Sequence, residues 1–259
     1  MLYPHYSYPL RAIPGLAADM LLGRHRSFRS DAVACLARLE PPLRVLGKEN
    51  IPHNGPCVLT FNHYYRPGFG AWWLALAIAS VVPVGLHWIM TGELTFPGKW
   101  YAPLGMAGSR WLLKRVSHVY GFTTMPPMPP RRHDLEARAR AVLEVLSYVQ
   151  HTEHPILGLA PEGSDQPGGR LSWPASGSGR FGFLLASRGL RFVPVGAYEA
   201  EGEFRLSFGP AYELSLPRGL SPDEKDRQAA KVIMQNIARQ LPLHLRGEFA
   251  TTDEGDEHR

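Results

Sequence analysis

Short apolar runs alternate with helical stretches through most of the chain. Runs rich in β-branched and aliphatic residues, bounded by Pro, Gly and Asn, predict buried strands. These strands are expected at residues 43–47, 56–60, 86–91, 119–123, 155–160, 191–198 and 204–208. Apolar residues spaced by three and four positions predict helices at 71–82, 107–118, 134–149 and 179–189. The alternation predicts an α/β fold, a largely parallel mixed sheet covered by helices on both faces.

The last helix has a clear start signal. Ser221 is placed to cap it, Pro222 takes its first position, and Glu224 completes a capping box. Without an internal repeat or a long linker, one continuous domain is expected at 43–248, with a flexible tail at 249–259. Residues 1–42 form an amphipathic helical segment that either packs on the domain or attaches to a membrane surface.

One stretch imitates a membrane span. Residues 71–90 contain no Lys, Arg, Asp or Glu and have the length needed to cross a bilayer. Because Pro83 and Gly85 interrupt the stretch, we predict a buried helix, a turn and a strand. A membrane-spanning or membrane-dipping helix is the alternative. No secretory signal pattern is evident at the start of the sequence.

Composition narrows the functional classes. The 259 residues are 44% hydrophobic and 20% charged, which is typical of a globular protein. A net charge of +5 suits an anionic membrane surface or an anionic substrate, and an ordinary solvated surface equally well. No nucleic-acid-binding motif is present, so no nucleic acid partner is expected. Two cysteines make no disulfide framework, Cys57 is expected to be buried in its strand, and the histidines lack metal-ligand spacing, so no metal site is expected.

Two predicted strands end in groups capable of acid–base chemistry. The strand at 56–60 leads into Asn62-His63, and the strand at 155–160 leads into Pro161-Glu162-Gly163. Strand ends at the rim of an α/β sheet are where such folds usually gather their chemistry. The sequence therefore predicts an imidazole and a carboxylate at one edge of the sheet.

These pieces resemble the motifs of the glycerolipid acyltransferase superfamily, of the lysophosphatidic acid type. Asn62-His63 is similar to its first motif, Pro161-Glu162-Gly163-Ser164 to its third, and Val193-Pro194-Val195 to its fourth, and the resemblance extends over residues 45–198. Three departures stand out. Gly68 replaces the aspartate of the first motif, Asp165 replaces the arginine of the third, and the second motif is barely recognisable at 120–124.

The resemblance implies the glycerolipid acyltransferase fold and an O-acyltransferase activity within phospholipid biosynthesis. A fatty acyl group would move from acyl-CoA or acyl carrier protein to a hydroxyl of a glycerolipid or another lipid alcohol. His63 would act as general base without a covalent intermediate, and no cofactor beyond the thioester co-substrate is implied. The expected partners are an acyl thioester donor, a lipid acceptor and a membrane surface, and the expected location is cytoplasmic and peripherally membrane-associated.

Other residues would have to replace the motif aspartate and arginines that this sequence lacks. We hypothesise that Asp165 or Glu162 orients His63 in place of the missing aspartate. Arg66, Arg170 and Arg180 are candidates for binding an anionic group, and the other expected substrate-binding residues are Asn62, Pro161, Gly163 and Ser164. The apolar run at 72–78 either lines an acyl channel or is ordinary helix burial. The alternative function is a non-catalytic relative that binds lipid or acyl thioester.

Overall fold

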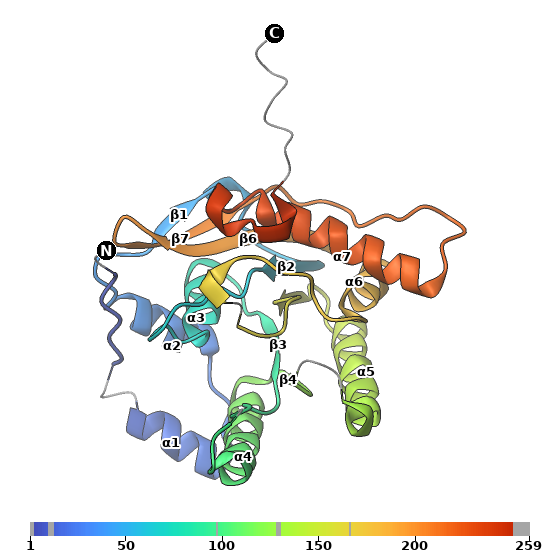
Figure 1. Ribbon diagram of the computed structural model, residues 1–259. Coiled ribbons are helices and arrows are strands. Elements are labelled where there is room, and N and C mark those ends of the chain that lie inside the picture. Colours follow the sequence, from blue (N-terminus) through green and yellow to red (C-terminus); the bar gives the residue numbers. More distant parts are fainter. Residues whose placement is uncertain (1–2, 10–12, 97, 128–130, 166, 251–259) are drawn as a thin grey trace.

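The computed structural model describes residues 3–9, 13–96, 98–127, 131–165 and 167–250. Within them lies a seven-stranded sheet of order β1-β7-β6-β2-β5-β3-β4 (Figure 1). The hairpin of β6 and β7 is antiparallel, and the other neighbouring strands of this described sheet pair in parallel. The strands are β1 (Arg44–Leu46), β2 (Cys57–Phe61), β3 (His87–Thr91), β4 (Thr123–Met125), β5 (Ile156–Leu159), β6 (Arg191–Ala200) and β7 (Glu203–Phe208).

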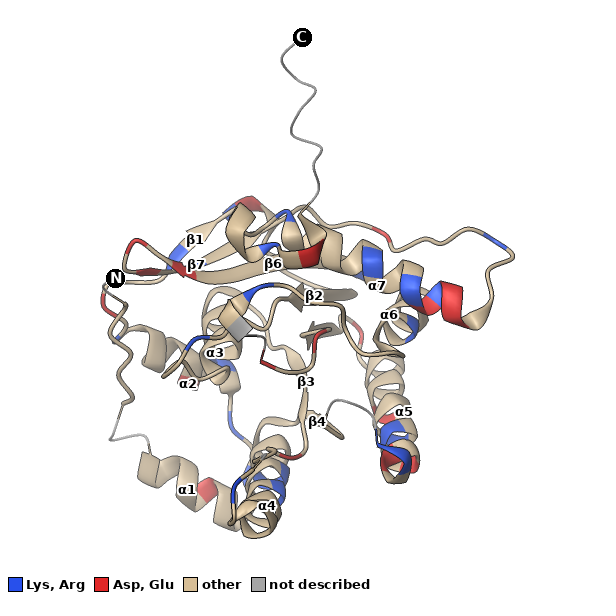
Figure 2. Ribbon diagram, viewed as in Figure 1, with Lys and Arg blue, Asp and Glu red and all other residues tan. Residues whose placement is uncertain are grey.

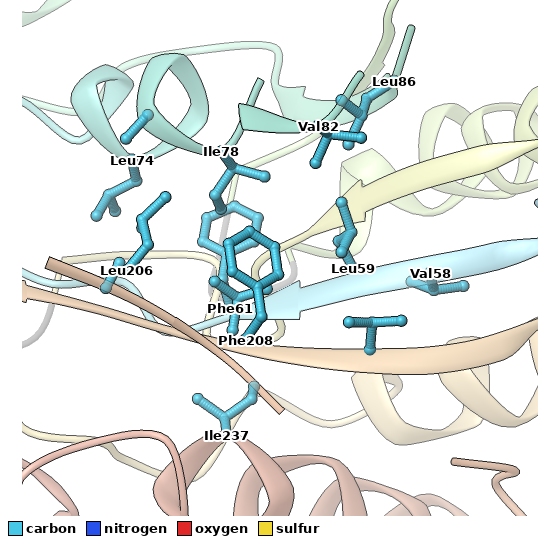
Figure 3. Close-up of a cluster of buried hydrophobic side chains, with 14 of the residues drawn as sticks. Val58, Leu59, Phe61, Leu74, Ile78, Val82, Leu86, Leu206, Phe208 and Ile237 are labelled. Atoms are coloured by element: carbon cyan, nitrogen blue, oxygen red, sulfur yellow. The ribbon is translucent and has the colours of Figure 1, made fainter. Parts of the chain in front are cut away.

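Helices cover both faces of the sheet, as predicted. On one face α7 packs on β6 and β2 with α6 beside it, and on the other α3 packs with α2 (Figure 1). Figure 3 shows this layering, with Leu74 and Ile78 of α3 on one side of the strands and Ile237 of α7 on the other. The helices are α1 (Ile13–Leu22), α2 (Phe28–Leu36), α3 (Trp72–Val81), α4 (Ala102–Tyr120), α5 (Leu135–His151), α6 (Ser178–Ala186) and α7 (Pro222–Ala238).

The uncharged stretch at 71–90 is a helix followed by a strand, as predicted. Six residues of α3 are buried, and β3 follows it after a turn. In the described part of the chain, no helix combines the length and the apolar character needed to span a bilayer. Cys57 is buried in β2, also as predicted.

The predicted strand at 119–123 is wrong. Helix α4 begins at Ala102, earlier than the expected 107, and continues through Tyr120. It ends at Gly121, whose φ of +70° is the left-handed conformation that terminates helices. Strand β4 therefore starts only at Thr123. Val119 and Tyr120 have high strand propensity, but α4 already includes them.

Helix α7 begins with the predicted capping box. The Ser221 main-chain N–H donates to Glu224 Oε2 (2.8 Å), and the Glu224 N–H donates to Ser221 Oγ. The predicted tail is outside the described residues from 251 onward. The boundary between the N-terminal segment, which contains α1 and α2, and the α/β domain stays a prediction.

A buried carboxylate of α7 holds the start of α6. The main-chain N–H groups of Gly177 and Arg180 donate to Asp226, each at 2.7 Å. Gly179 lies so close to α7 that a Cβ would meet the Asp226 carbonyl oxygen at 1.9 Å. The Asp226 carboxylate and the absence of a side chain at Gly179 therefore allow α6 and α7 to pack closely.

We predict that Asp226→Ala lowers the free energy of unfolding by about 1 to 3 kcal/mol, because it removes the buried carboxylate that accepts from two N–H groups at the start of α6. Urea denaturation of both proteins measures the change. Asp223→Ala is the matched control on the same helix, since the Asp223 side chain is 97% exposed. Equal midpoints for the two variants would contradict the capping role of Asp226.

Candidate active site

His63 stands two residues past the end of β2, at the edge where β5 also ends. Thr60 of β2 is in register with Leu159 of β5, so the two strands end side by side. The main-chain N–H of His63 donates to Glu162 Oε2 at 2.7 Å. The predicted meeting of the histidine loop and the Pro161-Glu162-Gly163 loop is thus present in the structure.

Asp165 provides the carboxylate next to the imidazole. Its Oδ1 lies 2.9 Å from His63 Nδ1, although the pair does not have the angles of a hydrogen bond. The His63 side chain is largely buried, whereas the Asp165 side chain is 51% exposed. Of the two acids hypothesised to orient the ring, the structure places Asp165 at the ring itself.

The Glu162 carboxylate accepts hydrogen bonds from main-chain N–H groups. Its second oxygen, Oε1, accepts a hydrogen bond from the Ser172 N–H at 2.9 Å. The residue is buried, and burial raises the pKa of its carboxyl above the ordinary value, while the two main-chain N–H donors oppose that rise. Glu162 therefore joins three segments, the histidine loop, its own loop and the segment at Ser172.

The Asn62 side chain has a structural role. Its side-chain amide donates to the Ala197 carbonyl at 2.9 Å, and its Oδ1 accepts from the Ala197 N–H at 2.7 Å. These two bonds tie the end of β2 to the middle of β6. The predicted substrate-binding role of Asn62 gains no support from this geometry, since both ends of its amide are paired inside the protein.

Arg66 binds a protein carboxylate. Its Nε and Nη2 both donate to Glu199 at the end of β6, with Nη2 at 2.8 Å from Oε1. Glu199 also accepts from the hydroxyls of Tyr6 (2.6 Å) and Tyr64 (3.2 Å). The prediction that Arg66 binds a substrate anion therefore gains no support. Local sequence gave no sign of this partner, which is 133 positions away.

Arg180 lies at the start of α6 and not beside His63. Its side chain is half exposed, with Nη2 at 3.8 Å from Asp223. The Arg180 main-chain N–H already donates to Asp226, so the prediction that Arg180 binds a substrate anion gains no support. Arg170, the third arginine considered, has an exposed side chain.

A cleft of about 680 Å³ opens beside His63. Gly163, Ser164 and Asp165 lie on its wall. Five aromatic side chains from the N-terminal segment, the histidine loop and α3 also line it, namely Tyr6, Tyr8, Phe69, Trp72 and Trp73, and residues of the segment at 91–95 complete the wall. The sequence patterns did not predict that Tyr6 and Tyr8 line the cleft. The aromatic and proline-rich start of the sequence was the available signal for an N-terminal contribution.

Gly68 also lines the cleft. Its φ is +81°, a conformation that glycine adopts freely and other residues rarely do. The histidine loop therefore turns at Gly68. The carboxylate comes from the neighbouring loop, through Asp165.

A smaller cavity of about 140 Å³ adjoins the cleft. It shares Thr91, Pro127 and Gly163 with the cleft wall and also includes Pro161. Its lining is mostly apolar, with Met90, Val142, Leu159 and Phe181 among its residues. Among the described residues, no group of three or more His, Cys, Asp or Glu side chains is arranged to hold a metal ion.

No protein-family model and no curated protein matches the sequence. Among solved structures, the chain is similar to the crystal structure of the 1-acyl-sn-glycerophosphate (LPA) acyltransferase PlsC from Thermotoga maritima, with a TM-score of 0.50 and 15% identity. The alignment covers 82% of this chain and 77% of that chain. At this identity the similarity concerns the fold, and it confirms the predicted α/β class.

We predict that the stability difference between the wild type and Glu162→Gln depends on pH. A carboxyl whose pKa is raised by folding is most favourable while protonated, and that contribution is lost as pH rises from the unfolded value of about 4.5 through the folded value. The free energy of unfolding of the wild type, relative to the variant, should therefore fall over this interval. Denaturation at several pH values measures it, with exposed Glu153→Gln as control. A difference that rises with pH would contradict the raised pKa.

Proposed function

We propose that this protein is an O-acyltransferase that moves a fatty acyl group from an acyl thioester to a hydroxyl of a glycerolipid or another lipid alcohol. The observation that carries the proposal is the pair of His63 and Asp165, 2.9 Å apart, on the wall of an aromatic cleft. The fold similarity to a lysophosphatidic acid acyltransferase supports acyl transfer as the reaction class. The motifs at Asn62-His63 and at 161–164 support the same family.

In the proposed reaction, His63 Nε2 removes the proton of the acceptor hydroxyl. The acceptor oxygen attacks the thioester carbonyl carbon, a carbon–oxygen bond forms, and the carbon–sulfur bond then breaks. The imidazolium returns its proton to the departing thiolate, so the products are an ester and a thiol. Asp165, next to Nδ1, keeps the ring in the tautomer that leaves Nε2 unprotonated and stabilises the imidazolium.

We assign the two cavities to different parts of the substrates. The apolar cavity that adjoins the cleft at Thr91, Pro127 and Gly163 is the proposed site of the acyl chain. The aromatic wall with Trp72 and Trp73 is the proposed surface for the rest of the lipid. The donor is proposed to be acyl-CoA or acyl carrier protein, and the location cytoplasmic and peripheral to a membrane.

The alternative is a relative that binds lipid or acyl thioester without turnover. It is favoured by the Asp165 side chain, which is half exposed and not aligned for a hydrogen bond with His63. A weakly held acid orients an imidazole poorly. Thiol release by the purified protein separates the two functions.

We predict that His63→Ala lowers the rate of thiol release from an acyl thioester by at least about a hundredfold, the usual contribution of a general base. The assay uses a water-soluble thioester and glycerol phosphate or a lysophospholipid as acceptor, with mass spectrometry of the ester product. If wild type and variant release thiol at equal rates, only the binding function remains.

We predict that Asp165→Asn lowers kcat at least about tenfold and leaves KM nearly unchanged, because the ring loses its orienting charge while asparagine keeps the size and shape of the side chain on the cleft wall. Asp223→Asn serves as the control, an exposed aspartate outside the cleft. An unchanged kcat for Asp165→Asn would remove Asp165 from the mechanism while leaving His63 in it.

A further inference from the structure

Helix α4 has its apolar side turned outward. Its buried residues include two serines, Ser109 and Ser117, whose hydroxyls donate to the carbonyls of Met106 and Lys114 in the same helix. On the outside, Leu104 is 76% exposed, and Trp111 and Leu112 are also exposed. Amphipathic helices of globular proteins normally show the opposite arrangement, with the apolar stripe facing the core.

Helix α1 adds to this exposed surface. Its sequence contains one charged residue, Asp19, and none of its residues is buried. The Asp19 carboxylate is paired with Arg26 at 2.6 Å. Helix α1 packs beside α4, and α4 contacts β4, the end strand of the sheet (Figure 1). We call the exposed apolar residues of this region the α1–α4 surface, namely Leu21, Leu22, Trp100, Leu104, Trp111 and Leu112.

The charges around this surface are basic. Helix α4 contains Arg110, Lys114 and Arg115 and no acidic residue, and Figure 2 shows blue segments along it and no red ones. The Arg115 guanidinium carbon lies 6.0 Å from the centre of the Trp111 ring. Exposed Trp and Leu with Lys and Arg on one helix are typical of a helix that lies in the interface of an anionic bilayer. A second copy joined through the same surface would bring basic residues against basic residues.

One segment of the chain connects the cleft wall with the α1–α4 surface. Thr91, Glu93, Leu94 and Thr95 line the cleft, and the chain then runs through Trp100, which is 89% exposed, into α4. Leu94 itself is exposed on the cleft wall. A bilayer bound to this surface would therefore lie next to the segment that forms part of the cleft wall.

We propose that the α1–α4 surface docks on an anionic lipid bilayer, with α4 lying along the interface. Trp100, Leu104 and Trp111 enter the head-group region, and Lys114 and Arg115 contact acidic lipid. The docking itself rests on the exposed surface and its charge. That it delivers a lipid substrate to His63 rests on the proposed function.

Flotation of the full chain with vesicles tests the docking. Wild type is expected to float with vesicles of phosphatidylcholine and phosphatidylglycerol, and less with phosphatidylcholine alone. The double variant Trp100→Ser/Leu104→Ser is expected to bind at least about tenfold more weakly, since it removes two large apolar contacts. The matched control is Leu135→Ser/Leu143→Ser, which changes two α5 leucines that are 63% and 64% exposed.

The charge contribution has its own variant. Lys114→Glu/Arg115→Glu should reduce flotation with the anionic vesicles and change little with neutral ones. The proposal is overturned if wild type does not float, or if the α4 and α5 double variants bind equally. It is also overturned if Trp100→Ser/Leu104→Ser converts a lipid-free dimer to a monomer in size-exclusion chromatography with light scattering, because the surface would then join two copies.

Turnover separates this inference from the proposed function. With a water-soluble thioester and glycerol phosphate, Trp100→Ser/Leu104→Ser should keep the wild-type rate, because neither residue lines the cleft. With a lysophospholipid embedded in anionic vesicles its rate should fall together with binding. A wild type that floats but releases no thiol would retain the docking and remove the acyltransferase proposal.

Discussion

The parallel pairing of β2 with β5 is the constraint on which the candidate site depends. Cys57 is opposite Ile156 and Thr60 opposite Leu159, so the two strands end together and their loops leave the same edge of the sheet. The buried Glu162 carboxylate then fixes the distance between the loops by accepting from the His63 N–H and the Ser172 N–H. A one-residue slip of this pairing would invert the faces of the strand and separate imidazole from acid.

The rest of the histidine loop is held from the side of β6. Asn62 exchanges two hydrogen bonds with Ala197, and Arg66 binds Glu199, which also holds Tyr6 of the N-terminal segment. His63 thus lies between two fixed points in β6 and one in the β5 loop. This explains how the ring is positioned although Gly68 carries no carboxylate. Asp165 lies beside the ring on another loop, and the Glu162 carboxylate keeps the two loops together through bonds to main-chain N–H groups.

Most of the fold was predictable because burial leaves a local pattern. The β-branched runs became β2, β3, β5, β6 and β7, and the end of β2 met the end of β5 since parallel neighbours must end at one edge. The strand expected at 119–123 failed because strand propensity competed with a longer helix that ends at Gly121. Glu199, the partner of Arg66, is far from it in sequence. Tyr6 is likewise far in sequence from the other residues that line the cleft. Such contacts follow from topology, and local periodicity does not contain them.

The outward-facing side of α4 illustrates the same limit. Its apolar stripe was visible in the sequence, but only the packing reveals that Ser109 and Ser117 face inward. Ser109 Oγ accepts from the Leu94 N–H at 3.1 Å, and Arg110 binds the buried Glu93 carboxylate. Glu93 and Leu94 are both part of the cleft wall. Ser109 and Arg110 are consecutive residues that join α4 to that wall, so the orientation of α4 and the shape of the cleft entrance depend on each other. A partner that binds the outer side of α4 therefore meets the cleft in a fixed orientation.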